Sequence, residues 1–351
     1  MASTGRDPAA LDTASPRSSP IGTVCPLACV SLPAAGTLRG LARWEVGASA
    51  QRPRRTALPR AQTAGPRKSA AIDLHIHSHA SDGEASADHI AEVARQRHLR
   101  LIAIADHDEG RESMRLAASA PDIAVAAIEL TCRGLGGYAD LLGIGLRDPT
   151  QLAAYWTFGT INAMRLQLWR QRLGELGWDL ADFDRPGETR ASWVISGQVF
   201  ASTESRQRAA ALGMQTEAQF RSLMLSKGTA GHIDGAILDL AVPVEEGIAA
   251  ILRAGGVPVL AHPGLGPLAF PGFDEAIDEL VESGLEGLEV VHPAHDAATE
   301  RRLSAAAETR GLLVSVGSDT HDGDERIGRL ASRADLDVAR ILASWIDRLG
   351  R

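Results

Sequence analysis

The stretch Ile72–His77 reads Ile-Asp-Leu-His-Ile-His, and its alternation decides the fold that this sequence predicts. In a β-strand successive side chains point to opposite faces. One face would carry Ile72, Leu74 and Ile76, and the other would carry Asp73, His75 and His77. Two imidazoles two residues apart on one face can reach the same metal ion. A lone buried histidine would more often be a core residue than a metal ligand. We therefore predict a core strand with a metal-binding face, followed by a turn.

Further groups that can bind a metal lie at the ends of later apolar runs or in turns. They are Asp82, Asp106-His107, Glu129, Asp140, His262 and Asp319-x-His321. In a barrel of parallel strands, polar residues that end a buried strand mark the functional face. Imidazole and carboxylate donors suit hard or borderline divalent ions such as Mn²⁺, Zn²⁺ or Fe²⁺. Chemistry explains such a collection better than packing does.

Short apolar runs alternate with amphipathic stretches from residue 70 onward, which is typical of α/β proteins. Predicted strands are Ala71–His77, Leu101–Ala105, Ile123–Leu130, Ala139–Gly145, Val257–Ala261, Gly287–Val291 and Leu312–Val316. Predicted helices are Ser86–His98, Thr160–Leu176, Thr216–Ser226, Val244–Ala254, Phe273–Ser283, Asp296–Thr309 and Asp335–Arg348. Ser86 and Asp296 suit N-caps, and Gly255, Gly284 and Gly311 suit helix ends. Seven strands at this spacing favour a parallel barrel, and no Gly-x-Gly-x-x-Gly follows the first strand to indicate dinucleotide binding.

The sequence predicts four segments. Residues 1–69 lack any sustained period and suit a disordered leader, with a basic interaction tail as the alternative. The barrel would occupy residues 70–147 and 244–351. Residues 148–243, which contain four of the six tryptophans, would form a helical insertion between barrel strands. Such an insertion either shapes substrate choice or serves as a structural cap.

Charge and cysteine content limit the partners. Residues 1–68 are basic, which leaves a balance of −15 for the rest of the chain. An acidic body disfavours long nucleic acids as partners, because phosphate backbones need a broad basic surface. The three cysteines give no disulfide framework, and Ile21–Val30 is too short and interrupted to span a membrane. We expect a cytoplasmic protein with no membrane partner; the oligomeric state stays open.

The quoted motifs resemble the PHP family, named for polymerase and histidinol phosphatase. Asp-Leu-His-x-His…Ser-Asp-Gly, Asp-His-Asp, Glu, Ala-His-Pro and Gly-Ser-Asp-x-His occur in the family's order over residues 71–147 and 244–328. The layout is most similar to its YciV-like nucleotide phosphoesterases. The resemblance implies a distorted (β/α)7 TIM-like barrel with two or three divalent metal ions. It implies a first metal on His75, His77, Glu129 and Asp319, a second on Glu129, Asp140 and His262, and a third on Asp82, His107 and His321.

The chain departs from this family pattern at two places. Relatives usually have histidine where this chain has Asp140, which either ligates or weakens the second site. Their insertion commonly carries Gly-Arg-Pro-His, whereas Ile195–Ala201 reads Ile-Ser-Gly-Gln-Val-Phe-Ala. The residues that would grip a phosphate there are missing. Arg190, Arg206 and His232 could compensate, although a surface position is expected for each.

Residues beside the motifs receive weaker expectations. His79 and His295 lie in predicted rim turns and are candidate substrate contacts. Glu289 is expected to lie behind the ligands, Asp106 to orient a histidine, Asp108 to be solvated, and Cys132 to be a buried inert thiol.

The function expected from the sequence is phosphoester hydrolysis. We predict a metal-dependent phosphatase that cleaves a small phosphomonoester, such as a nucleoside 3′,5′-bisphosphate, with a metal-bridged hydroxide. Asp82, His107, Glu129, Asp319 and His321 would act catalytically through the metals. The alternatives are a 5′-3′ exonuclease on short oligonucleotides, a hydrolase of another bond, and a non-catalytic metal-binding module.

Overall fold

Seven strands form the central sheet of this protein, in the computed structural model that describes residues 72–184, 190–226, 229–233, 241–265, 272–321, 325–330, 333 and 335–351. These residues all belong to one unit, Gln62–Arg351. The predicted leader, residues 1–69, lies outside the described residues. In sheet order the strands are β1 (Ile72–Ile76), β2 (Leu101–Ile104), β3 (Ala124–Leu130), β6 (Leu141–Ile144), β8 (Val257–Leu260), β9 (Gly287–Val291) and β10 (Leu313–Val316). All seven predicted strands are present.

Strand direction differs from the prediction at one place. The pairs β1–β2, β2–β3, β8–β9 and β9–β10 are parallel, but β6 runs antiparallel to both β3 and β8. The expected parallel barrel is therefore wrong at β6. A parallel bridge between Ile76 and Thr320 joins the last strand to the first, so the sheet is a nearly closed barrel.

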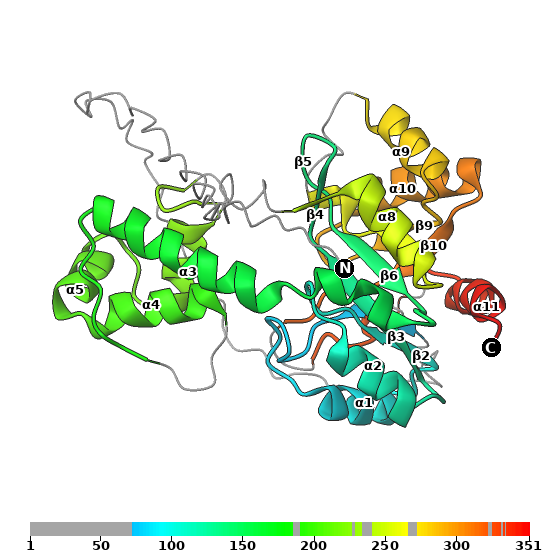
Figure 1. Cartoon of the computed structure of the whole chain (residues 1–351), viewed down its shortest axis with the longest axis horizontal. Coiled ribbons are helices and arrows are strands. Elements are labelled where there is room, and N and C mark those ends of the chain that lie inside the picture. The colour runs from blue at the N-terminus through cyan, green and yellow to red at the C-terminus, as the bar shows by residue number, and fades with distance from the viewer. Residues whose placement is uncertain are drawn as a thin grey trace, which may run out of the picture. The chain divides into compact units, whose positions relative to one another are not determined.

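Helices cover the outside of this sheet. They are α1 (Ala87–Gln96), α2 (Arg111–Ser119), α8 (Val244–Arg253), α9 (Phe273–Glu282), α10 (Ala297–Arg310) and α11 (Val338–Leu349). Figure 1 shows α2 beside β2 and β3, α1 beside α2, and α10 beside β9 and β10. The predicted caps are present, since Ser86 accepts from the His89 N–H, Asp296 accepts from the Thr299 N–H, and Gly311 ends α10 in the left-handed conformation. Helix α2 was not predicted.

A second group of helices follows the first half of the sheet. It comprises α3 (Phe158–Glu175), α4 (Ala191–Ala201), α5 (Thr203–Ala211) and α6 (Glu217–Phe220), with a π-helical turn, Arg221–Leu225. Side chains such as Trp169, Leu173 and Phe220 give these helices a hydrophobic core of their own. Helices were predicted here, although α4 and α5 were not, and the boundaries 148 and 243 remain predictions.

A small sheet closes the helical segment. Strand β4 (Cys132–Gly134) pairs with β5 (Gly137–Tyr138) and, in parallel, with β7 (Val242–Pro243). The chain therefore returns beside its point of departure. None of the described helices has the length and apolar character needed to cross a bilayer.

Candidate metal centre

Side chains from six of the seven strands meet at one mouth of the barrel. Among the described residues, three groups have donor atoms within 4.8 Å of one another: His77 with Asp82, His107 and His321; His75 with Glu129 and His262; and His75 with His77 and Asp319. The shared histidines make these groups one continuous cluster. The structure thus brings together eight of the nine predicted ligands.

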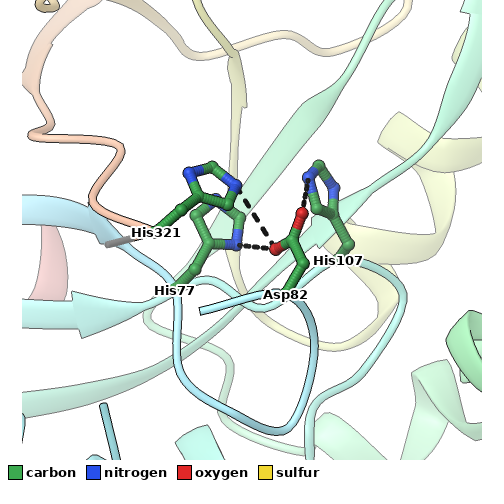
Figure 2. A group of neighbouring side chains, drawn as sticks. All are labelled: His77, Asp82, His107 and His321. Atoms are coloured by element: carbon green, nitrogen blue, oxygen red, sulfur yellow. Dashed lines mark ion pairs between the residues drawn. The ribbon is translucent and has the colours of Figure 1, made fainter. Parts of the chain in front are cut away.

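The first group surrounds the carboxylate of Asp82. Its Oδ1 lies 3.3 Å from His321 Nε2 and 3.6 Å from His77 Nδ1, and its Oδ2 lies 3.9 Å from His107 Nε2. Figure 2 shows the three imidazoles turned toward this carboxylate. The side chains of Asp82, His107 and His321 are 24–34% exposed, so this side of the cluster is open to solvent.

The other two groups are buried. His262 Nε2 lies 2.9 Å from Glu129 Oε1, and Asp319 Oδ1 lies 3.1 Å from His77 Nε2 and 3.6 Å from His75 Nε2. His75 and Glu129 are fully buried, and Asp319 is only partly exposed. A water-excluded cluster of imidazoles and carboxylates is costly unless its charges are matched.

Three atoms of the cluster have no hydrogen-bond partner, and this is the best test of whether it suits a metal. They are His77 Nδ1, His107 Nδ1 and Glu129 Oε2, and all are buried. Glu129 Oε2 nevertheless has imidazole nitrogens at 3.0, 3.2 and 3.3 Å, from His107, His75 and His77. Buried polar atoms are rarely left unmatched. Bound cations would satisfy them, and nitrogen and oxygen donors without thiolate suit Zn²⁺, Mn²⁺ or Fe²⁺.

Asp140, the ninth predicted ligand, lies at the edge of the cluster. It immediately precedes β6, so a parallel β6 would have placed it at the opposite end of the barrel. The antiparallel direction brings it to the same mouth, where its Oδ2 is 3.9 Å from His262 Nε2. Burial, reinforced by the charge of Glu129, raises the pKa of Asp140 to about 6. Asp140 is adjacent to the second predicted metal position but outside the three groups.

Charge pairing dominates the electrostatics of the cluster. Burial lowers the pKa of His262 and His321, but the hydrogen bond and charge of Glu129 (for His262) and of Asp82 (for His321) outweigh it and raise each pKa to about 9. Burial and the charge of His321 lower the pKa of His77 to about 4. Burial raises the pKa of Asp82, but His107 and His321 more than reverse this and hold it below its usual range. The carboxylates therefore attract positive charge, as a cation site requires.

Three polar residues lie in or just after β9, and two of them contact the cluster. Glu289 faces His75, as its position in the sequence suggested. His292 Nε2 lies 3.1 Å from Asp319 Oδ2, a contact that sequence reasoning did not find. His295, predicted as a substrate contact, has both ring nitrogens engaged with the backbone, at Val290 O and Gly264 N. That geometry favours a structural role for His295.

The remaining predictions have mixed outcomes. His79 is exposed and belongs to none of the three donor groups. Asp106 accepts from the Ser78 N–H and from the hydroxyls of Ser78 and Ser81, so it holds a turn and the expected contact with a histidine is wrong. Asp108 is buried and accepts from the Thr131 N–H, so the expectation of a solvated residue is also wrong. Cys132 is buried, as expected.

Arg190 lies closer to the cluster than its expected surface position. Its guanidinium stacks over Trp193 at 4.0 Å, donates to the backbone oxygen of Asp82 at 3.4 Å, and lies 3.8 Å from Glu84. Its side chain is only 14% exposed. The nearby Trp193, three residues along the chain, was the one sequence signal for this arrangement.

The stretch Ile195–Ala201 lies within α4 and faces the helical core. Ile195 and Val199 are fully buried, and Gln198 donates to Phe183 O and accepts from Arg170. These positions are thus engaged in packing within the helical segment.

Known proteins with similar sequences are phosphoesterases. The chain is 28% identical over 269 residues to a phosphoribosyl 1,2-cyclic phosphate 1,2-diphosphodiesterase of Eggerthella lenta, covering 74% of this chain and 98% of that protein. It is 26% identical over 255 residues to a 3′,5′-nucleoside bisphosphate phosphatase of Chromobacterium violaceum, covering 71% and 87%. A 5′-3′ exoribonuclease of Escherichia coli, Rnm, is 24% identical over 264 residues, covering 71% and 84%. No protein-family model matches the chain.

Solved structures give the same result. A Bifidobacterium adolescentis protein described as a metal-dependent phosphoesterase aligns with a TM-score of 0.59 at 25% identity, covering 80% of this chain and 98% of its own. An amidohydrolase of Chromobacterium violaceum, solved with bound sulfate, shares the fold with a TM-score of 0.60 at 24% identity, covering 79% and 96%. The chain is therefore similar in sequence to phosphoesterases and in fold to a metal-dependent phosphoesterase, and the prediction of a hydrolase of this type is confirmed.

Proposed function

We propose that this protein hydrolyses a small phosphomonoester at a centre of two or three divalent ions, with Mn²⁺, Zn²⁺ or Fe²⁺ as the candidates. The observation that carries the proposal is Glu129 Oε2, which is buried without a hydrogen bond among three imidazole nitrogens. This carboxylate would hold divalent ions together with the three imidazoles around it.

The donor groups suggest how the ions would be held. His75, His77 and Asp319, with Glu129, would hold the first, and His262 with Glu129 and Asp140 the second. Asp82, His107 and His321 would hold the third. Bound divalent ions would lower the pKa of water toward neutrality and neutralise phosphate oxygens.

The protein's own residues define where substrate would approach. His75, His77 and Glu129 are fully buried and exclude water from one side. Asp82, His107 and His321 are partly exposed and form the accessible side. A phosphate group would enter there, beside Arg190, whose contact with the Asp82 loop places a fixed positive charge near this opening.

The substrate class we favour is a nucleotide such as a nucleoside 3′,5′-bisphosphate. The relative from Chromobacterium violaceum, a phosphatase of such compounds, supports it. The relative from Eggerthella lenta makes a phosphoribosyl cyclic phosphate the first compound to compare. The packed Ile195–Ala201 stretch means that this chain would recognise its substrate by other residues.

A release assay tests the proposal. Purified protein is incubated with a nucleoside 3′,5′-bisphosphate or phosphoribosyl 1,2-cyclic phosphate, with and without chelator, and inorganic phosphate and nucleotide products are measured. We expect phosphate release from the bisphosphate that chelator abolishes, that Mn²⁺ restores, and that Glu129→Gln lacks. Release that survives complete metal removal would refute the proposal.

The second candidate is 5′-3′ exonuclease activity on short RNA. The similarity to the Escherichia coli exoribonuclease, over 84% of its length, favours testing it. Short 5′-phosphorylated RNAs separate the two functions, because an exonuclease releases mononucleotides in sequence whereas a phosphatase releases only inorganic phosphate.

A further inference from the structure

Strand β9 is the one strand of the seven-stranded sheet that carries none of the nine candidate ligands. It lies between β8, which His262 follows, and β10, which Asp319 follows. Its own polar residues, Glu289 within the strand and His292 just after it, are buried and directed at the ligands of neighbouring strands.

Glu289 contacts ligands in two of the donor groups. Its Oε1 and Oε2 lie 3.0 and 3.2 Å from His75 Nδ1, and Oε2 accepts the backbone N–H of His262 at 2.8 Å. Because a carboxylate only accepts, Nδ1 of His75 must carry the proton, which leaves the Nε2 lone pair facing Glu129 and Asp319. The bond to His262 also fixes a backbone whose φ is 26°, an unfavourable value outside glycine.

Gly317 makes the contact between Glu289 and His75 possible. A Cβ atom at Gly317 would lie 2.1 Å from Glu289 Oε1 and 2.3 Å from His75 Cβ. Glu289 therefore occupies the space that a side chain at residue 317 would need, and in this way it reaches past β10 to His75 of β1.

His292 also orients a candidate ligand, Asp319, by donating a hydrogen bond to it. The backbone N–H of Ala294 donates to His292 Nδ1 at 3.1 Å, so Nε2 carries the proton and donates to Asp319 Oδ2 at 3.1 Å. This leaves Asp319 Oδ1 facing His75 and His77, at 3.6 and 3.1 Å. His292 is 3% exposed, which keeps water from competing for that bond.

We infer that Glu289 and His292 are positioning residues: β9 supplies no ligand but fixes the proton and direction of His75, the backbone of His262 and the free oxygen of Asp319. The inference rests on the proposed metal centre, and it assigns the orientation of ligands from three strands to a fourth. Substitution of residues that hydrogen-bond metal ligands in this way commonly lowers metal affinity by about 10- to 100-fold.

The test measures metal affinity without substrate. Protein stripped with chelator is titrated calorimetrically with Mn²⁺, and folding is checked by circular dichroism. His292→Phe keeps the ring volume but loses the donor, whereas His292→Gln places an amide N–H close to the position of Nε2. We expect roughly a tenfold or greater loss of affinity for the phenylalanine variant and recovery of most of it in the glutamine variant.

Glu289→Gln provides the second arm, since it keeps the shape and an acceptor oxygen but removes the charge. We expect at least about a tenfold loss of Mn²⁺ affinity. Two matched controls should bind Mn²⁺ as wild type does. They are His89→Gln, at an exposed residue of α1, and Glu300→Gln, which removes the carboxylate of α10 that pairs with the partly exposed Arg333. If Glu289→Gln does not fold, the two His292 variants decide.

The outcomes separate this inference from the proposed function. Wild type that binds Mn²⁺ but releases no phosphate from any substrate refutes the function and leaves the positioning roles intact. Equal Mn²⁺ affinity in wild type, His292→Phe and Glu289→Gln overturns the inference, as does a folded wild type that binds no metal.

Discussion

At the residue scale, backbone strain is concentrated at the mouth of the barrel. Five non-glycine residues among those described have positive φ, and three of them, Asp108, His262 and Asp319, lie beside or within the cluster. Such conformations persist only where the surroundings fix them. The Asp319 N–H donates to His75 O at 2.8 Å, and Glu289 holds the N–H of His262. The strain is thus held by the same neighbours that orient the ligands.

Gly317→Ala is expected to destabilise the protein and to weaken metal binding. The added methyl group has no space between Glu289 and His75, so overpacking should cost about 1–3 kcal/mol of the free energy of unfolding. Urea denaturation measures this loss of free energy of unfolding, and titration of the variant with Mn²⁺ should show weaker metal binding than in wild type. Gly159→Ala in α3, where a Cβ meets nothing within 4 Å, is the control and should leave both unchanged. Equal stability of Gly317→Ala and wild type would show that Glu289 has more room than the structure gives it.

Cys132 is expected to resist alkylation in the folded protein. Burial, reinforced by the charge of Asp140, raises the pKa of its thiol well above the ordinary value. A raised pKa favours the protonated, unreactive thiol, so raising the pH from 7 to 9 should not produce thiolate at this position, although it would for an ordinary cysteine. Iodoacetamide labelling followed by peptide mass spectrometry measures it. Labelling of Cys132 at pH 9 that equals labelling in urea would contradict this expectation.

At the element scale, the sequence predicts where strands lie better than which way they run. Apolar runs ending in polar residues located all seven strands, because burial of both faces leaves a clear pattern. The reversal of β6 leaves no such pattern, since a period of two is the same in both directions. Helix α4 was missed because it is apolar on most of its faces, with Ser196 and Gln198 buried, and so lacks an amphipathic period.

The direction of β6 has a testable consequence at Asp140. Because β6 is antiparallel, Asp140 lies 3.9 Å from His262 at the mouth, so it should contribute to binding of one ion. Asp140→Ala is expected to weaken one of the Mn²⁺ binding steps by about tenfold, the order expected for a residue beside the ligands, and to leave the other steps in place. Calorimetric titration resolves the steps. If the titration of Asp140→Ala equals that of wild type, Asp140 does not contribute to metal binding.

At the scale of the whole molecule, the candidate site was largely predictable, but its surroundings were not. Eight of the nine predicted ligands fall into the three donor groups because each follows or ends a strand. Glu289 was expected behind the ligands and His292 directly follows β9, but neither position predicts which ligand it contacts, and Arg190 follows no strand. Their roles depend on which segments become neighbours, such as α4 beside the Asp82 loop, and local sequence does not encode that.

Arg190 links the helical segment to the cluster, and its removal should affect substrate binding. Arg190→Ala loses the contact with Asp82 O and the positive charge beside the opening. We expect KM for a phosphomonoester to rise about 10- to 100-fold, the equivalent of one hydrogen bond to a charged group. Arg206→Ala, an exposed arginine of α5 that contacts Phe200 O, is the control and should leave KM unchanged. Equal KM in both variants would place Arg190 outside substrate binding.

Elemental analysis of the purified, folded protein most directly tests whether these converging side chains bind metal. Protein dialysed against metal-free buffer should retain two or three divalent ions per chain, and Glu129→Gln, which removes the shared carboxylate, should retain fewer. A folded wild-type protein that contains no divalent metal, and takes none up when Mn²⁺ or Zn²⁺ is supplied, would contradict the account.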